Sequence, residues 1–393
     1  MKRGTRDIGL LALLHSVQHV YLNALPPLYY LLRLEFDVST FQIGLIGSVL
    51  GVISILQGPA GYLVERLGGK RLAVLSMLIC SVAVALYSLA SSFEVLLVFV
   101  GIFALSQVTF HPATYAMVVQ RALDGRRGKY IAYHQVGGFV GTAVGTAVIA
   151  YLVPIQGWRA TLQLIPVVGL GVIVAFWRLV HDSVAASRPR VGPDAAATSN
   201  PGDDEQFRVT TPLLILIVGV AIVSLGNLLR YVPLFLADAY GETVAWAGVL
   251  SSIMHAVGSG SSLVGGVASD RFDKVTVLVG ALIVSGFATI LLAVGQFSSL
   301  LLLLVLVLYG VAHYFPVPAQ HSLFSLIAAG HPQGIGFSYT AIALGQIFAD
   351  PLIGYLMDIL GARTAFLICS VFPFIAGAII LILKRVTRLP AAH

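Results

Sequence analysis

The chain has 393 residues, of which 58% are hydrophobic and only 10% are charged. Soluble domains carry about a quarter of their residues as charged side chains, so this composition excludes a protein that works mainly in water. The formal net charge of +6 would suit a nucleic-acid-binding protein, but Lys and Arg gather in alternate connections between apolar segments, which is a signal of membrane topology.

Long apolar segments follow one another along the whole chain. A bilayer core about 30 Å thick needs about 20 apolar helical residues per crossing, and the runs are too long for a β-barrel, whose strands alternate. Windows of about 19 residues predict an all-α membrane protein with twelve transmembrane helices. In chain order these cover residues 8–32, 41–63, 71–91, 94–122, 130–153, 159–181, 212–237, 245–268, 274–297, 299–328, 334–357 and 363–385. Gly, Pro and amide residues interrupt the second, fourth, eighth and tenth, as is typical of helices that line a cavity.

The beginning of the chain and its cysteines add two expectations. Met1-Lys2-Arg3 resembles the basic start of a signal peptide, but the apolar stretch behind it is long and lacks a small-residue cleavage site, so we expect an uncleaved first helix. Cys80 and Cys369 fall within the third and twelfth predicted helices. Two cysteines at such depth do not indicate a disulfide framework.

Basic residues predict the orientation in the membrane. One set of connections holds only Arg33, Arg159 and Arg363, whereas the opposite set, with both termini, holds most of the Lys and Arg residues. By the positive-inside rule both termini lie in the cytoplasm, which predicts a multi-pass protein of the inner (plasma) membrane.

A polar stretch divides the chain into two similar halves. Residues 182–211 are rich in Ala, Pro, Ser and Asp and are predicted to be a flexible cytoplasmic linker between two six-helix bundles, 1–181 and 212–393. Landmarks recur between the halves at an offset of 204 or 205 residues, which indicates duplication of a six-helix unit. The pairs are Gly61 and Gly266, Glu65 and Asp270, Arg66 and Arg271, Pro112 and Pro316, and Arg159 and Arg363.

A repeated motif follows the second and eighth predicted helices. Each copy has a Gly, an acid four residues later, then Arg and a basic end. Both copies resemble the loop motif of the major facilitator superfamily, and the resemblance extends over about 8–385. It implies two bundles that rock around a site at the membrane midplane. As a gating latch, the carboxylate would pair with Arg across the halves; the alternative is plain positive-inside charge. The latch residues are Gly61, Glu65, Arg66, Arg71, Gly266, Asp270 and Arg271.

A narrower resemblance lies in the first half. The strings that carry it are Phe110-His111-Pro112 and His134-Gln135-Val136-Gly137-Gly138, followed by Gly141 and Gly145, with His15 in the first helix. They are similar to fosmidomycin-resistance-type members of the superfamily, which implies a proton-coupled drug exporter. The chain departs from that pattern twice, having His19 where those exporters tend to place an acid and Thr146 where they often have Pro.

Polar residues inside the predicted helices indicate a transport pathway, independently of the family resemblance. Ionisable side chains within a membrane are costly and by default face a cavity or a partner. His15, His19 and Asn23 are spaced four residues apart and therefore share one face of the first helix. His111 has a similar depth in the fourth helix, and His313 is its counterpart in the tenth. Each histidine alone could instead form a hydrogen bond between helices.

Two opposite charges have matching depths in the second half. Arg230 in the seventh helix and Asp350 in the eleventh could form a buried ion pair, or a free Arg230 could hold an anionic substrate through a bidentate contact. Gln57, His255 and His321 are interpreted as bridges between helices.

These observations favour a secondary transporter of a small molecule. No nucleotide-binding loop of the Gly-x-x-x-x-Gly-Lys type is present, so a proton gradient is the expected energy source. Export of a drug-like or small anionic compound follows from the narrower resemblance, and uptake of a small organic acid fits Arg230 equally well. His19 is a candidate proton carrier because an imidazole has an ordinary pKa of about 6.5, and Asp350 is its rival.

Other function classes are less well supported by the residues. His15 and His19 have the spacing of two metal ligands, but the residues between them lack the Glu of a zinc-hydrolase motif, so metal transport is favoured over a polytopic membrane enzyme. The linker is too short and polar for a signalling domain. We expect no cofactor, no resident metal and no nucleic acid. The expected partners are substrate, protons and lipid, with the chain a monomer.

Overall fold

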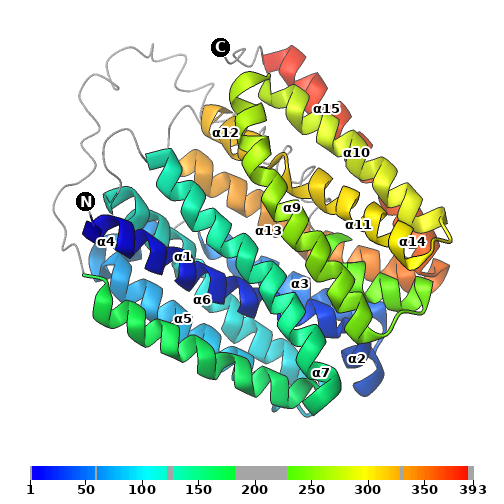
Figure 1. Ribbon diagram of the computed structural model, residues 1–393, viewed down its shortest axis with the longest axis horizontal. Helices are drawn as coiled ribbons and strands as arrows, with labels where there is room; N and C mark the ends of the chain where they lie inside the picture. Colours follow the sequence, from blue (N-terminus) through cyan, green and yellow to red (C-terminus); the bar gives the residue numbers. More distant parts are fainter. Residues whose placement is uncertain (1, 58–59, 122–126, 182–227, 328–331, 388–393) are drawn as a thin grey trace.

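The computed structural model describes residues 2–57, 60–121, 127–181, 228–327 and 332–387, and every regular element within them is a helix. Figure 1 shows long helices lying side by side, with the beginning of α1 and the end of α15 toward the same side of the molecule. The α-helices are α1 (Lys2–Leu22), α2 (Tyr29–Glu35), α3 (Thr40–Ser54), α4 (Ala60–Leu67), α5 (Gly69–Tyr87), α6 (Phe93–Arg121), α7 (Arg127–Leu179), α9 (Val244–Arg271), α10 (Lys274–Val294), α11 (Ser299–Tyr314), α12 (Val317–Ile327), α13 (Pro332–Leu360), α14 (Ala362–Cys369) and α15 (Val371–Thr387). Residues 228–240 are also helical, and two short 3-10 helices cover Pro26–Leu28 and Ile55–Gln57.

The described residues contain ten helices long and apolar enough to cross a membrane. One of these, α7, consists of two helices that meet at Gly157, whose φ of 79° is not helical. The chain doubles back there (Figure 1), so the predicted fifth and sixth helices are both present. The linker 182–211 and most of the predicted helix 212–237 lie outside the described residues. The all-helical membrane fold is confirmed, whereas the count of twelve stays a prediction.

Proline accounts for breaks in two of the predicted spans, the first and the tenth, and the second also loses its regular α-helix before its predicted end. The first span is divided before Pro26, the second ends its regular α-helix at Ser54, and the tenth is divided around Pro316. The fourth and eighth spans are continuous, with Pro112 inside α6, so the predicted interruption of these two helices is wrong. One missing N–H donor does not end a long membrane helix, because neighbouring helices and side chains satisfy the freed backbone group.

Left-handed turns recur with the offset found in the sequence. Gly157 has a φ of 79° and Gly361 a φ of 80°, 204 residues later. Asp37 and Gly241 are also 204 residues apart, with φ values of 49° and 69°. Each turn precedes a helix, and glycine adopts this conformation without a steric cost. The recurrence supports the interpretation that a six-helix unit is duplicated.

Two arginines hold equivalent turns in the two halves. Each guanidinium donates hydrogen bonds to two backbone carbonyls at or just beyond the end of α5 or α10, and also to a group at the end of an earlier helix. Arg159 bonds to Ser88 O (2.7 Å), Ala90 O (2.9 Å) and Glu35 Oε1 (2.7 Å), and Arg363 bonds to Ala293 O (3.1 Å), Gly295 O (2.6 Å) and Ala239 O (2.9 Å). The planar fork of arginine suits such multiple contacts.

Replacing Arg363 with lysine is therefore expected to destabilise the protein by about 1.5–3 kcal/mol, because one ammonium cannot satisfy three carbonyls in this arrangement. Thermal unfolding of the purified protein in detergent measures the loss. Arg178→Lys, at an exposed position of α7, is the matched control. An unfolding temperature equal to that of the control would show that the carbonyls do not depend on the guanidinium.

Candidate functional site

Four histidines form a cluster between α1, α6 and α7. The ring of His15 lies at its centre, stacked on His134 with centroids 4.1 Å apart and edge-on to His19 at 4.6 Å and His111 at 5.5 Å. His15 and His134 are fully buried side chains, and the other two are partly buried. The structure thus brings together four of the predicted site residues. Among the described residues, no group of three or more potential ligands is arranged to hold a metal ion.

Glycines allow α7 to approach α1 at this cluster. A Cβ atom at Gly137 would lie 2.2 Å from the carbonyl oxygen of Ala12, and one at Gly141 would lie 2.0 Å from that of Ser16. Close helix approach through small residues is a general feature of membrane packing. The glycines of the fifth predicted helix therefore have a packing role, which places His134 against the ring of His15.

Hydrogen bonds fix several of these side chains. His15 Nδ1 lies 2.7 Å from the carbonyl oxygen of His134, and His19 Nδ1 lies 2.9 Å from the hydroxyl of Thr142. Asn23 donates through its amide to the carbonyl of His19 and to Thr142. The predicted polar face of the first helix is thus engaged with α7. Sequence reasoning missed Thr142, because a threonine within an apolar helix is not a distinctive signal.

The predicted pathway residue His313 lies apart from this cluster. His313 in α11 contacts Tyr314, whose hydroxyl lies 2.9 Å from Nδ1 of His255 in α9. The interpretation of His255 as a bridge between helices is therefore confirmed. Gln135 is half-buried near the beginning of α7. His321 has no described side chain.

The predicted ion pair in the second half is present. Arg230 Nη1 lies 3.0 Å from Asp350 Oδ2. The Asp350 side chain is only 3% exposed, whereas that of Arg230 is 22% exposed. The hydroxyl of Tyr231 donates to the backbone carbonyl of Asp350 at 2.7 Å. The second carboxylate oxygen, Oδ1, is buried without a partner among the described residues, so the pair is held through one oxygen only.

The carboxylate of Asp350 occupies a notch in a helix from the other half. A Cβ atom at Gly47 of α3 would lie only 1.7 Å from Asp350 Oδ2. Arg230, the cation of this pair, also lines a small cavity. The other side chains that line this cavity are apolar or aromatic. The lining comprises Tyr21, Leu22, Leu25, Pro26, Tyr29, Ile46, Leu50, Tyr87, Val100, Phe103 and Arg230. The pair therefore lies where helices of the two halves meet, with its cation at the cavity wall.

The two halves also contact one another on the side that the sequence predicts to be external. Arg33 forms a bidentate ion pair with Asp238, at 2.8 and 2.6 Å, between positions 205 residues apart. The carboxylate of Asp358 accepts hydrogen bonds from the backbone amides of Thr40 and Phe41, each at 2.8 Å. An acid at a helix N-terminus is stabilising there. The Asp358 contacts join the beginning of α3 to the end of α13, and the Arg33 pair joins α2 to the helix at residues 228–240, so both hold the two halves together on this side.

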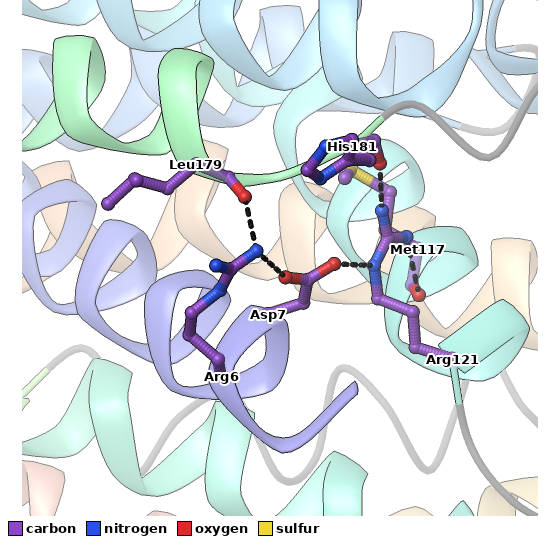
Figure 2. A network of polar contacts seen from close by, with 6 residues as sticks. All are labelled: Arg6, Asp7, Met117, Arg121, Leu179 and His181. Carbon is purple, nitrogen blue, oxygen red and sulfur yellow. Dashed lines mark hydrogen bonds and ion pairs between the residues drawn. The ribbon is translucent and has the colours of Figure 1, made fainter. Parts of the chain in front are cut away.

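A further polar network lies at the predicted cytoplasmic end of the first half (Figure 2). Asp7 is bonded to Arg121 at 3.2 Å and to Arg6 at 3.4 Å. Arg121 also donates to the carbonyl of His181, and Arg6 to that of Leu179. The network ties the beginning of α1 and the end of α6 to the end of α7, which is where the chain leaves the first half.

The repeated loop motif is only partly described. Arg66 lies over the ring of Tyr62, 4.3 Å from its centroid, and Arg71, Asp270 and Arg271 are exposed. The surroundings of Gly61 and the side chain of Glu65 lie outside the described residues, and a Cβ atom at Gly266 would lie 3.9 Å from the ring of Pro318. The latch therefore stays a proposal.

Comparison with known proteins agrees with this architecture. A bacterial homologue of the human lysosomal transporter Spinster, solved in an inward-facing and occupied conformation, superimposes with a TM-score of 0.80 at 16% identity, over 98% of this chain and 97% of that one. At this identity the likeness concerns the fold alone.

Sequence relatives cover most of the chain. The fosmidomycin resistance protein of Escherichia coli (strain K12) is 23% identical over 378 residues, covering 94% of this chain and 90% of that protein. The cis,cis-muconate transport protein of Acinetobacter baylyi is 24% identical over 368 residues, covering 87% and 86%. The family model of the Major Facilitator Superfamily matches residues 11–339. The chain therefore belongs to the Major Facilitator Superfamily and is a multi-pass membrane protein of a family that performs secondary transport of small molecules.

Proposed function

We propose that this protein is a proton-coupled transporter of a small organic anion that works by alternating access. The observation that carries the proposal is Arg230, a cation at the wall of an aromatic cavity and paired with a buried carboxylate. An arginine can bind a carboxylate or phosphonate through two parallel hydrogen bonds. The surrounding aromatic rings suit an apolar substrate body.

The ion pair itself suggests how substrate and proton are coupled. A substrate anion that takes Arg230 from Asp350 leaves that carboxylate buried without its cation, which is costly. Uptake of a proton by Asp350 removes this cost. Anion and proton therefore favour one another's binding, because both stabilise the same state. Such linkage supports symport, in which the two move together and an acidic exterior drives uptake.

Export by proton antiport is the second candidate. The similarity to the fosmidomycin resistance protein favours it, since that relative spans nearly the whole chain. The muconate transport protein, whose name refers to an organic anion, favours the first candidate at comparable identity. In antiport the proton and the substrate would compete for the carrier instead of supporting one another.

Transport by proteoliposomes distinguishes the two mechanisms. The vesicles are loaded with a pH-sensitive dye and exposed to cis,cis-muconate, then to fosmidomycin. Symport predicts that entry of the anion acidifies the interior, and antiport predicts that it makes the interior more alkaline. Anion flux with no proton movement in either assay would contradict proton coupling, and absence of flux with a wider panel of organic anions would contradict the substrate class.

The remaining candidate residues are assigned roles within this scheme. His19 and Asp350 are proposed as proton carriers, one in each half. His15, Asn23, His111 and His134 are proposed to surround the first carrier, with Gln135 and His313 along the pathway. The loop motifs with Glu65 and Asp270 are proposed as a latch on the cytoplasmic side, opposite the contact made by Arg33.

Orientation in the plasma membrane is proposed from the distribution of basic residues, with both termini in the cytoplasm and residues 182–211 as the linker between the two bundles. A cysteine introduced at Ser199 is expected to be shielded from an impermeant thiol reagent in intact cells. A cysteine introduced at Glu94, an exposed position at the beginning of α6, is expected to react. Reaction of the Ser199→Cys protein from outside would reverse the orientation. The native Cys80 and Cys369 are buried and give a low background.

A further inference from the structure

His15 has a defined tautomer when its ring is neutral. Its Nδ1 lies 2.7 Å from the carbonyl oxygen of His134, and a carbonyl can only accept a hydrogen bond. Nδ1 therefore carries the hydrogen and Nε2 carries a lone pair. Nε2 is buried and has no hydrogen-bond partner among the described residues. Buried polar atoms are nearly always paired, so an unpaired acceptor at the centre of a cluster requires an explanation.

The hydrogen bonds around His19 give its ring the same tautomer. Thr142 donates its hydroxyl hydrogen to the carbonyl of Gly138 and accepts from the amide of Asn23. The orientation of that amide is set by its donation to the backbone carbonyl of His19. The hydroxyl of Thr142 then accepts from Nδ1 of His19, so the lone pair of His19 is also on Nε2.

The two imidazole edges meet at one glycine. A Cβ atom at Gly138 would lie 2.8 Å from Nε2 of His19 and 2.8 Å from Cε1 of His15, the atom next to its Nε2. The ring centroids are 4.6 Å apart and the rings nearly perpendicular. Only a residue without a side chain leaves the space between these edges open.

We propose that a single transported proton is held between Nε2 of His15 and Nε2 of His19, and that Gly138 is the positioning residue that gives it room. This inference rests on the proposed proton-coupled function. It adds the pair of acceptors in the first half and the number of protons that this pair holds, beside the carrier Asp350 of the second half. In the neutral pair both Nε2 atoms are acceptors, so neither can donate to the other. One added proton turns one ring into an imidazolium, which supplies a hydrogen bond between the rings and a partner for the buried Nε2 of His15.

The neighbouring groups limit the pair to one proton. The titratable side chains that face it are His111 of α6 and His134 of α7, with Tyr115 of α6 beyond His134. None of these is an acid that could balance a second positive charge. Two positively charged rings with centroids 4.6 Å apart would repel each other strongly in a medium of low dielectric. The cluster therefore gains one proton and shares it.

Histidine ¹⁵N NMR of the purified full-length protein tests the site with the proton itself as the ligand. Resonances of His15 and His19 are assigned from their loss in His15→Asn and His19→Asn. At high pH both rings are expected to show protonated Nδ1 and unprotonated Nε2. On acidification both Nε2 signals are expected to shift together, as one shared event. A protonated Nε2 in either neutral ring, or two independent titrations, would overturn the proposal.

Gly138→Ala separates this arrangement from a purely structural role of the histidines, because it removes no titratable group. The shared titration should be lost, whereas Gly171→Ala, in the second of the two helices of α7 with nothing within 4 Å of the new methyl group, should retain it. His15→Asn is the second variant, because asparagine can still donate to the carbonyl of His134 but has no atom at the Nε2 position. A shared titration that persists in Gly138→Ala contradicts the positioning role.

Proteoliposomes show whether the site serves transport, with the dye assay and cis,cis-muconate as before. Muconate-coupled proton flux should be lost in His15→Asn and Gly138→Ala and retained in Gly171→Ala. If the wild-type protein shares a proton by NMR but moves none with any organic anion, the proposed function fails and the proton site stands. If the wild-type protein moves protons but His15→Asn does so equally well, this inference fails and the proposed function stands.

Discussion

Replacing Arg230 with methionine is expected to remove most of the folded protein, because it leaves Asp350 buried without a cation. Breaking a buried ion pair by removing one partner costs about 3–5 kcal/mol. This is a large part of the total stability of about 5–15 kcal/mol that is usual for a folded domain. The yield of monodisperse protein and its unfolding temperature in detergent measure the effect.

The two partners are expected to behave unequally. Asp350 is only 3% exposed, whereas Arg230 is 22% exposed at the cavity wall and can be reached by water or substrate. Asp350→Asn should therefore fold better than Arg230→Met. The double variant Arg230→Met with Asp350→Leu should recover folded protein, because no charge remains buried. Neither variant that lacks Arg230 should bind an organic anion.

The contrary result would change the assignment of Arg230. If Arg230→Met has the yield and unfolding temperature of the wild-type protein, the pair contributes little to the fold. Loss of anion binding in such a well-folded variant would leave substrate recognition as the role of Arg230. Retention of both the fold and anion binding would remove Arg230 from the mechanism altogether.

Adding a methyl group at Gly354 is expected to open the side of the protein that holds Arg33. A Cβ atom at this position of α13 would lie 2.2 Å from the carbonyl oxygen of Thr40 at the beginning of α3. The clash is with backbone, so the two helices must move apart. Overpacking of this kind costs about 1–3 kcal/mol. Because α3 and α13 belong to different halves, the cost falls on the closed state and spares the packing within each half.

Such a change should shift the equilibrium toward the state that is open on the Arg33 side by about tenfold, the factor that corresponds to about 1.4 kcal/mol. A cysteine introduced at Leu50, which lines the cavity, reports the shift through its rate of reaction with an impermeant reagent added from outside. Gly280→Ala in α10 is the control, because nothing lies within 4 Å of its new methyl group. Equal labelling rates in the two proteins would mean that this contact does not set the closed state.

The ion pair of Arg33 and Asp238 on the same side should matter less than Gly354. Their side chains are 24% and 18% exposed. Ion pairs open to solvent contribute about 0–1 kcal/mol, since water and salt screen the charges. The clash introduced at Gly354 is steric, so its cost does not depend on ionic strength.

Several features of this protein could be predicted from its sequence because they depend on distances along the chain. Apolar length predicted the membrane class and most of the described helices, and the offset of 204 residues between Arg159 and Arg363 recurs in the turns at Gly157 and Gly361. Helical period placed His15 and His19 on one face of the first helix. Matching depth predicted the ion pair of Arg230 and Asp350.

Other features were decided by the tertiary structure. That His15 is the hub of the cluster depends on how closely α7 approaches α1, and this depends on where Gly137, Gly138 and Gly141 face the neighbouring backbone. The notch that Gly47 makes for Asp350 likewise depends on the rotation of α3 against α13. Periodicity along one helix fixes which residues share a face, but it carries no information on the rotation and depth at which two helices pack. The sequence therefore determined the polar residues available for a pathway, and helix packing decided which of them meet.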